Sequence, residues 1–144
     1  MEIDDWKGIF SNIFTNMNTK ATAIDLENRL IRFSVRVIKM AGSLPRETAA
    51  RHLSLQIIRS GSSPALNYGE AQNAESIEDF VHKMKICLKE LRETFICLKI
   101  IDQLGWFPND KLAPLLNENN ELIAIFTASA KTASNNKSKI PKSK

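Results

Sequence analysis

Apolar side chains recur every three or four residues through four long segments of this 144-residue chain, and this repeat restricts the fold more than any other feature. In residues 25–44 the apolar positions are separated by steps of 4, 3, 4, 3 and 4, which is the seam of a helix in a bundle or coiled coil. These positions are Leu26, Leu30, Phe33, Val37, Met40 and Leu44. No sustained alternation with a period of two is present, so the pattern does not favour strands.

Cap and breaker residues predict the ends of the first two helices. Asp25 is the predicted N-cap of the first helix, which is expected to end near residues 42–45. The second helix is predicted to start after Pro45 and to reach about Tyr68, with an interruption at residues 60–64. Pro64 has no N–H to donate and its ring crowds the preceding turn, so we expect a kink at this point.

The third and fourth helices are predicted from the same signals. Ser76, followed by an acid three residues later, is the expected N-cap of the third helix, and Gly105 is expected to close it. Asp110 is the predicted cap of the fourth helix. Short connections place successive helices antiparallel. The predicted fold is therefore an all-α, antiparallel up-down-up-down four-helix bundle formed by residues 24–127.

The two ends of the chain have sequence patterns that differ from those of the four predicted helices. Residues 1–23 contain apolar side chains at helical spacing followed by a polar stretch, and we expect an appended N-terminal helical segment. Residues 128–144 are rich in Ser, Asn and Lys and are predicted to form a disordered basic tail. The tail contains five lysines and no acidic residue, so its charge of +5 is larger than the net charge of +4 of the whole chain. The remainder of the chain is therefore slightly acidic.

Composition also restricts the cellular location and the chemistry. No apolar run approaches the roughly 20 residues that span a bilayer, and the N-terminus is acidic, so we expect a cytoplasmic protein without a membrane partner. Cys87 and Cys97 lie about 15 Å apart along one predicted helix, which is too far for a disulfide. We expect both to be reduced, buried and apolar in character.

The sequence does not favour an enzyme. Di-iron bundles use two Glu-x-x-His pairs and further carboxylates, whereas this chain has the single pair Asp79 and His82, and His52 has no acid three residues before it. No Ser or Cys nucleophile signature and no Gly-rich phosphate loop is present. We therefore expect no metal site, no cofactor and no catalytic residues.

A row of cations on the first helix is a candidate nucleic-acid-binding surface. Its members step by 3, 4 and 3 residues, so they share one flank of the helix over about 15 Å. They are Arg29, Arg32, Arg36 and Lys39, and Arg51 of the second helix extends the candidate surface. Cations at this spacing suit the phosphates of a nucleic-acid backbone. The alternative is an ordinary solvated face.

A polar stripe on the second helix steps by 4, 3, 4 and 3 residues, as an apolar seam would. Its members are Gln56, Ser60, Ser63, Asn67 and Glu70. One interpretation is a solvated face. The other is a hydrogen-bonded network in which Arg59, Asn67 and Glu70 meet charged residues of a neighbouring helix or subunit.

Several segments together resemble a known bacterial family over about residues 24–126. They are residues 25–29 (DLENR), 56–60 (QIIRS), 63–71 (SPALNYGEA) and 88–94 (LKELRET), together with Phe33, Leu44–Pro45, Asp79–Phe80 and Lys83. The family is that of the four-helix bundle proteins encoded in intervening sequences of 23S ribosomal RNA. It is similar to the accessory variability proteins of diversity-generating retroelements.

This resemblance implies a homo-oligomeric ring, typically a pentamer, and a basic surface that binds structured RNA or DNA. In the retroelement branch it also implies a reverse transcriptase as partner. The recurrent polar positions of the family correspond to Arg59, Ser60, Ser63, Asn67, Glu70, Lys89, Glu90 and Glu93, which are then expected to form a structural or intersubunit network. The alternative function is a protein-binding scaffold. In that case the arginines of the first helix pair with residues 61–127 of another subunit, a region that holds six basic and ten acidic residues.

Overall fold

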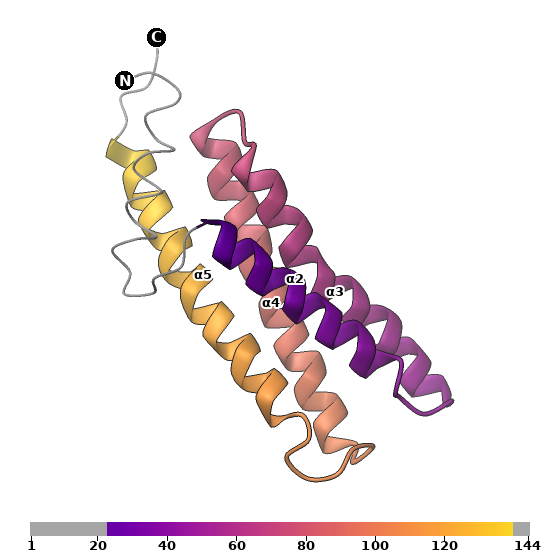
Figure 1. The fold of residues 1–144 in the computed structure, drawn as a ribbon. Helices are drawn as coiled ribbons and strands as arrows, with labels where there is room; N and C mark the ends of the chain where they lie inside the picture. The colour runs from indigo at the N-terminus through magenta and orange to yellow at the C-terminus, as the bar shows by residue number, and fades with distance from the viewer. Residues whose placement is uncertain (1–22, 140–144) are drawn as a thin grey trace.

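The computed structural model describes residues 23–139, and the regular secondary structure of this part consists of four α-helices. They are α2 (Ala23–Ala41), α3 (Thr48–Gln72), α4 (Ile77–Gln103) and α5 (Ala113–Lys139). Figure 1 shows the helices along one long axis, each antiparallel to the one before it. α3 packs against α2 and α4, and α4 packs against α5. The predicted all-α four-helix bundle is confirmed, whereas the predicted N-terminal helical segment lies outside the described residues.

The two predicted ends of α4 are confirmed. The hydroxyl of Ser76 accepts a hydrogen bond from the backbone N–H of Asp79 at 3.1 Å, as an N-cap residue does. Beyond the other end, Gly105 has a φ of 71°, a left-handed conformation that glycine adopts at little cost. The two ends of α4 are therefore set by its N-cap serine and by the glycine that follows it.

Three details of the other helices correct the sequence predictions. α2 begins at Ala23, so Asp25 lies in its first turn and is not its N-cap. α3 is continuous through Pro64, which is buried, and the predicted interruption at residues 60–64 is wrong. Packing between α2 and α4 keeps this segment helical despite the proline. Before α5, the backbone carbonyl of Asp110, and not a helix-capping side chain, accepts a hydrogen bond from the N–H of Ala113 at 3.2 Å.

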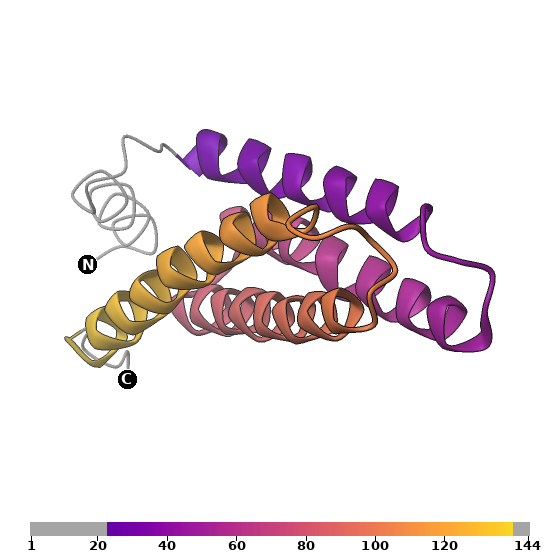
Figure 2. The same ribbon diagram turned by 90° about the horizontal axis from the view of Figure 1, so that it is seen from below.

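The C-terminal part of α5 is the largest correction to the predicted boundaries. The bundle was expected to end at residue 127, but α5 continues to Lys139, so residues 128–139 are not a disordered tail. Ala130 and Ala133 of this extension are buried. In Figure 1 the last turns of α5 extend past the N-terminal end of α2, and in Figure 2 they diverge from α2. Because Ala130 and Ala133 are buried, these turns belong to the folded bundle even though they leave α2.

The core follows the predicted apolar faces. Leu30 and Val37 of α2, Ile57 of α3 and Leu98 of α4 are fully buried. The rings of Tyr68 and Phe126 pack edge to face with their centroids 5.7 Å apart, which is a favourable geometry for an aromatic pair. Among the described residues, no helix is long and apolar enough to cross a membrane.

Asn119 is a polar residue in this core, and its replacement provides a first test. The side chain is fully buried; its amide N–H donates to the carbonyl of Leu91 at 3.0 Å, while its oxygen has no partner among the described residues. Replacing Asn119 with leucine removes the unsatisfied acceptor and adds apolar surface. We expect the free energy of unfolding to rise by up to about 1 kcal/mol in urea titrations at fixed protein concentration. If the free energy of unfolding falls instead, the amide of Asn119 is required for packing.

Candidate nucleic-acid interface

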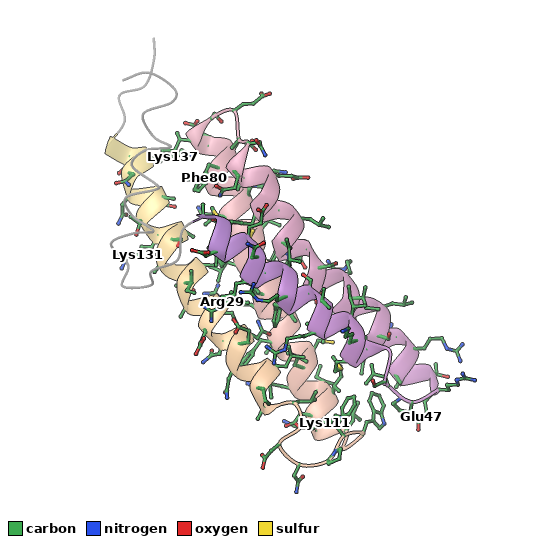
Figure 3. The ribbon with its side chains drawn as sticks, in the orientation of Figure 1. Arg29, Glu47, Phe80, Lys111, Lys131 and Lys137 are labelled. Carbon is green, nitrogen blue, oxygen red and sulfur yellow. The ribbon has the colours of Figure 1, made fainter. Side chains whose placement is uncertain are left out.

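Arg29, the first member of the predicted cation row, is bound within the bundle. Its Nε donates to Glu118 of α5 at 2.5 Å, and its guanidinium also pairs with Glu121. Figure 3 shows Arg29 on the side of α2 that faces α5. Because α2 and α5 otherwise meet over little surface, these ion pairs link the first and last helices. Arg29 is thus engaged in the fold and is less available to phosphates than its sequence position indicates.

The other predicted cations are exposed. Arg32, Arg36 and Lys39 lie along the outer face of α2, Arg51 lies on α3, and none of them forms an ion pair within residues 23–139. The cations on α2 alternate with exposed apolar side chains that step by 4 and 3 residues. These are Ile31, Val35 and Ile38, with exposed fractions of 47%, 44% and 44%. The outer face of α2 is therefore both basic and apolar.

The predicted polar stripe of α3 meets α4 of the same chain. Arg59 donates to Glu90 at 3.1 Å and to Glu93 at 2.6 Å, and the amide of Gln56 donates to Glu93 at 3.3 Å. Glu90 is only 8% exposed, whereas Arg59 remains more than half exposed. Glu90 and Glu93, which the family resemblance places in a structural or intersubunit network, thus join α4 to α3 within one chain.

Burial and charge move the pKa values of the two carboxyl groups in opposite directions. Burial raises the pKa of Glu90 above its ordinary value, and the nearby Glu93 raises it further against the opposing effect of Arg59. Burial would also raise the pKa of Glu93, but hydrogen bonds with Arg59, Glu90 and Gln56 outweigh burial and lower it. The proton is therefore held more tightly by Glu90.

The remaining members of the predicted network form smaller contacts. The hydroxyl of Thr94 donates to that of Ser60 at 3.0 Å inside the core. Asn67 donates to the hydroxyl of Ser63 at 2.9 Å, one turn away in α3. Lys83 donates to Glu70 at 2.6 Å at the surface. Lys89 is exposed and joins none of these contacts within the described part of the chain.

A second cation row, on the outer face of α4, was missed by the sequence analysis. Its members are separated by 4, 3 and 7 residues, all are exposed, and none forms an ion pair within residues 23–139. They are Lys85, Lys89, Arg92 and Lys99, and we name them the α4 basic row. At about 1.5 Å per residue the row extends over about 21 Å. The helical spacing of these cations was visible in the sequence, but only Lys89 was singled out there, as a member of the predicted polar network.

The remaining groups to consider among the described residues are the two thiols and the side chains that could bind a metal. Cys87 and Cys97 are both buried and unpaired, as predicted. Burial raises the pKa of the Cys87 thiol to about 12, which keeps it in the unreactive protonated form. Within residues 23–139, no three His, Cys, Asp or Glu side chains lie together as a metal site would require. Together with the rows of exposed cations, these features define a small four-helix bundle protein with basic outer faces.

Comparison with known proteins identifies the family. The family model of the 23S rRNA-intervening sequence proteins matches residues 23–128, and the chain belongs to this family. A similar solved structure is a protein of unknown function from the S23 ribosomal protein family of Bacteroides thetaiotaomicron. It has 28% sequence identity and a TM-score of 0.69, and the alignment covers 76% of this chain and 97% of that one. No curated protein was found to match this chain.

Proposed function

We propose that this protein is a non-enzymatic, homo-oligomeric bundle of the cytoplasm that binds structured RNA or DNA through exposed cations on α2 and α4. The observation that carries the proposal is the presence of two cation rows without acidic partners among the described residues: Arg32, Arg36 and Lys39 on α2, and the α4 basic row. Steps of three and four residues place neighbouring cations about 4.5–6 Å apart along a helix, which suits successive phosphates.

The rigidity of the scaffold supports this function. The α4 basic row lies on a 27-residue helix that packs against both α3 and α5. The backbone that carries these charges is already fixed, so only the exposed side chains must be ordered when the nucleic acid binds. The ribosomal RNA of the family's description makes a structured RNA the first ligand to test, and a reverse transcriptase is a further partner that the retroelement resemblance suggests.

The exposed apolar residues of α2 support the homo-oligomer and also the alternative function. Ile31, Val35 and Ile38 form a row beside Arg32 and Arg36, and such a mixed face suits contact with another protein surface. In our proposal this surface belongs to a second copy of the chain. In the scaffold alternative the α2 cations pair with that neighbour and no nucleic acid is bound.

Two matched variants separate these functions. One removes three charges from α4 (Lys85→Gln, Lys89→Gln and Arg92→Gln), and the other removes three from α2 (Arg32→Gln, Arg36→Gln and Lys39→Gln). Affinity for an RNA hairpin and a DNA duplex is measured across a salt series, and oligomer mass is measured by light scattering in the same buffers. Each variant that loses phosphate contacts should bind about tenfold or more weakly, with the salt slope reduced by about 2 to 3.

The outcomes distinguish the proposal from the scaffold. Weaker binding with unchanged mass supports the nucleic-acid function. Loss of mass in the α2 variant, with no binding to either probe by the unmodified protein, supports the scaffold. If the unmodified protein and both variants bind with equal affinity, neither cation row is the binding interface.

A further inference from the structure

A small open pocket lies between α4 and α5, beside the α4 basic row. Its volume is about 250 Å³, and one wall comes from α4 and the other from the first turns of α5. Six of the residues that line it are Phe95, Lys99, Asp102, Gln103, Asn117 and Asn120. Lys99 belongs both to this wall and to the basic row, so the pocket and the row form one continuous surface.

Helical spacing brings these groups together. Phe95, Lys99 and Gln103 step by four residues along one flank of α4, and Asn117 and Asn120 step by three along α5. The Nζ atom of Lys99 lies 4.9 Å from the centre of the Phe95 ring. The pocket therefore combines an aromatic wall, a cation, and amide groups at one site.

The polar side chains of the pocket have free hydrogen-bonding capacity. The side chains of Asp102, Gln103, Asn117 and Asn120 form no hydrogen bond with another described residue. An amide offers donors and acceptors together, and a carboxylate offers only acceptors. Asn and Gln pair with the edges of bases in this way, and a carboxylate accepts from the exocyclic amino group of a base.

We propose that this pocket receives one unstacked, amino-bearing nucleobase of a single-stranded segment, while the neighbouring phosphates lie along the α4 basic row. This inference rests on the proposed nucleic-acid function and specifies the form of ligand that it uses. The pocket is smaller than the range of about 300–1,000 Å³ that is usual for drug-sized ligands, so one planar ring suits it better than a larger molecule. Bases become available for such contacts in loops and single strands, where they stack on aromatic side chains.

The connection to the cation row identifies a base within a strand, and not a free nucleotide, as the occupant. The pocket is partly open to solvent, so an isolated base would leave part of its surface in water. A strand gains additional contacts from Lys85, Lys89 and Arg92, which follow Lys99 back along α4. The base is then held by proximity to phosphates that are already bound.

The test compares strands and variants of the full-length protein by fluorescence anisotropy. The ligands are a twelve-residue oligo(C), a twelve-residue oligo(U), a blunt RNA duplex and free CMP. The pocket variants are Phe95→Leu and the double variant Asn117→Ala and Asn120→Ala, whose asparagines are exposed. The control is Phe107→Leu, because Phe107 is also half-buried beneath a lysine ammonium, that of Lys111 at 5.4 Å, but lies outside the pocket.

We expect both pocket variants to bind oligo(C) about tenfold more weakly, with duplex affinity unchanged and no effect of the control. Oligo(U), which has no exocyclic amino group, should bind the unmodified protein more weakly than oligo(C), and Asp102→Asn should reduce that difference. Free CMP should bind far more weakly than either strand. Equal loss of duplex and oligo(C) binding, or no loss in both pocket variants, would overturn the pocket while leaving the cation rows intact. Absence of binding to every strand and duplex would overturn the proposed function itself.

Discussion

Replacing Gly61 with alanine should lower the free energy of unfolding by up to about 2 kcal/mol, because overpacking a core typically costs about 1–3 kcal/mol and the higher helix propensity of alanine offsets about 1 kcal/mol of that loss. A Cβ atom at this position would lie 2.7 Å from Cγ1 of Val37 and 3.1 Å from its Cβ. Val37 is fully buried and β-branched, so it has little freedom to rotate away. The added methyl group must therefore push α2 away from α3, and urea titration at fixed protein concentration measures the loss.

Gly69 is the matched control for this prediction. It lies in the same helix, and the nearest atom to an added Cβ is a carboxylate oxygen of Glu27 at the ordinary distance of 3.8 Å. Alanine is the better helix former by about 1 kcal/mol, so Gly69→Ala should be neutral or stabilising. Opposite signs at the two glycines would identify the close helix contact as the cause. Equal changes in the free energy of unfolding at the two glycines would contradict a close helix contact at Gly61.

A double variant tests the contact directly. Val37→Ala creates space at the point where the methyl group of Gly61→Ala would clash. The combined variant should therefore lose less stability than the sum of the two single losses, with a coupling energy of about 0.5–3 kcal/mol. The hydroxyl of Ser34 donates to the carbonyls of both Leu30 and Gly61, at 2.9 and 3.0 Å, and marks the same crossing point. Additive losses would show that Gly61 is not in contact with Val37.

The sequence predicted the four helices because the apolar spacing is regular, and at α4 the cap residues indicate the same boundaries. Leu26, Leu30, Phe33 and Val37 of the predicted seam form the buried face of α2, and Ser76 and Gly105 mark the limits of α4. The prediction failed at the C-terminal end because it relied on large apolar side chains. Phe126, Ala130 and Ala133 step by 4 and 3 residues, but alanines contribute little to a hydrophobic pattern even when they are buried.

The candidate site was predicted less completely, because spacing along one helix does not identify the partner on another. The spacing on α3 indicated a polar stripe. Its contacts with Glu90 and Glu93 of the same chain could be identified only from the folded structure. Similarly, Arg29 has the same spacing as Arg32 and Arg36, yet only Arg29 reaches the carboxylates of α5. The pocket between α4 and α5 joins residues more than ten positions apart, and no single-helix pattern contains it.

Replacing Arg59 with methionine should destabilise the bundle by about 1–3 kcal/mol at pH 7. Glu90 would remain 8% exposed beside Glu93 without the cation that now contacts both. The larger loss that is typical of breaking a fully buried ion pair is not expected here, because Arg59 is 55% exposed and water screens its charge. Lys83→Met is the control: it breaks the exposed pair with Glu70 and should have no measurable effect on stability.

The pH dependence of this loss identifies its cause. The folded-state pKa of Glu90 is raised, so this residue lowers stability as the pH rises from the ordinary pKa of 4.5 through the higher folded-state pKa. Glu93 has a lowered pKa, so the stability it contributes is present above pH 4.5 and is lost as pH falls through the folded value. Without Arg59 the first effect grows and the second shrinks. The cost of Arg59→Met should thus be largest near pH 7 and should decline toward pH 4.

Glu90→Gln completes the argument, because an amide occupies the same space without a charge. Alone, it should remove the decrease in stability above pH 4.5 that Glu90 causes. Combined with Arg59→Met, it should recover most of the loss at pH 7 while changing little at pH 4. If the Arg59→Met loss does not vary with pH, or if Glu90→Gln does not restore stability, the arginine contributes by packing its aliphatic stem and not by neutralising the carboxylates. The α3–α4 junction would then be held by the apolar core and by the Ser60–Thr94 hydrogen bond.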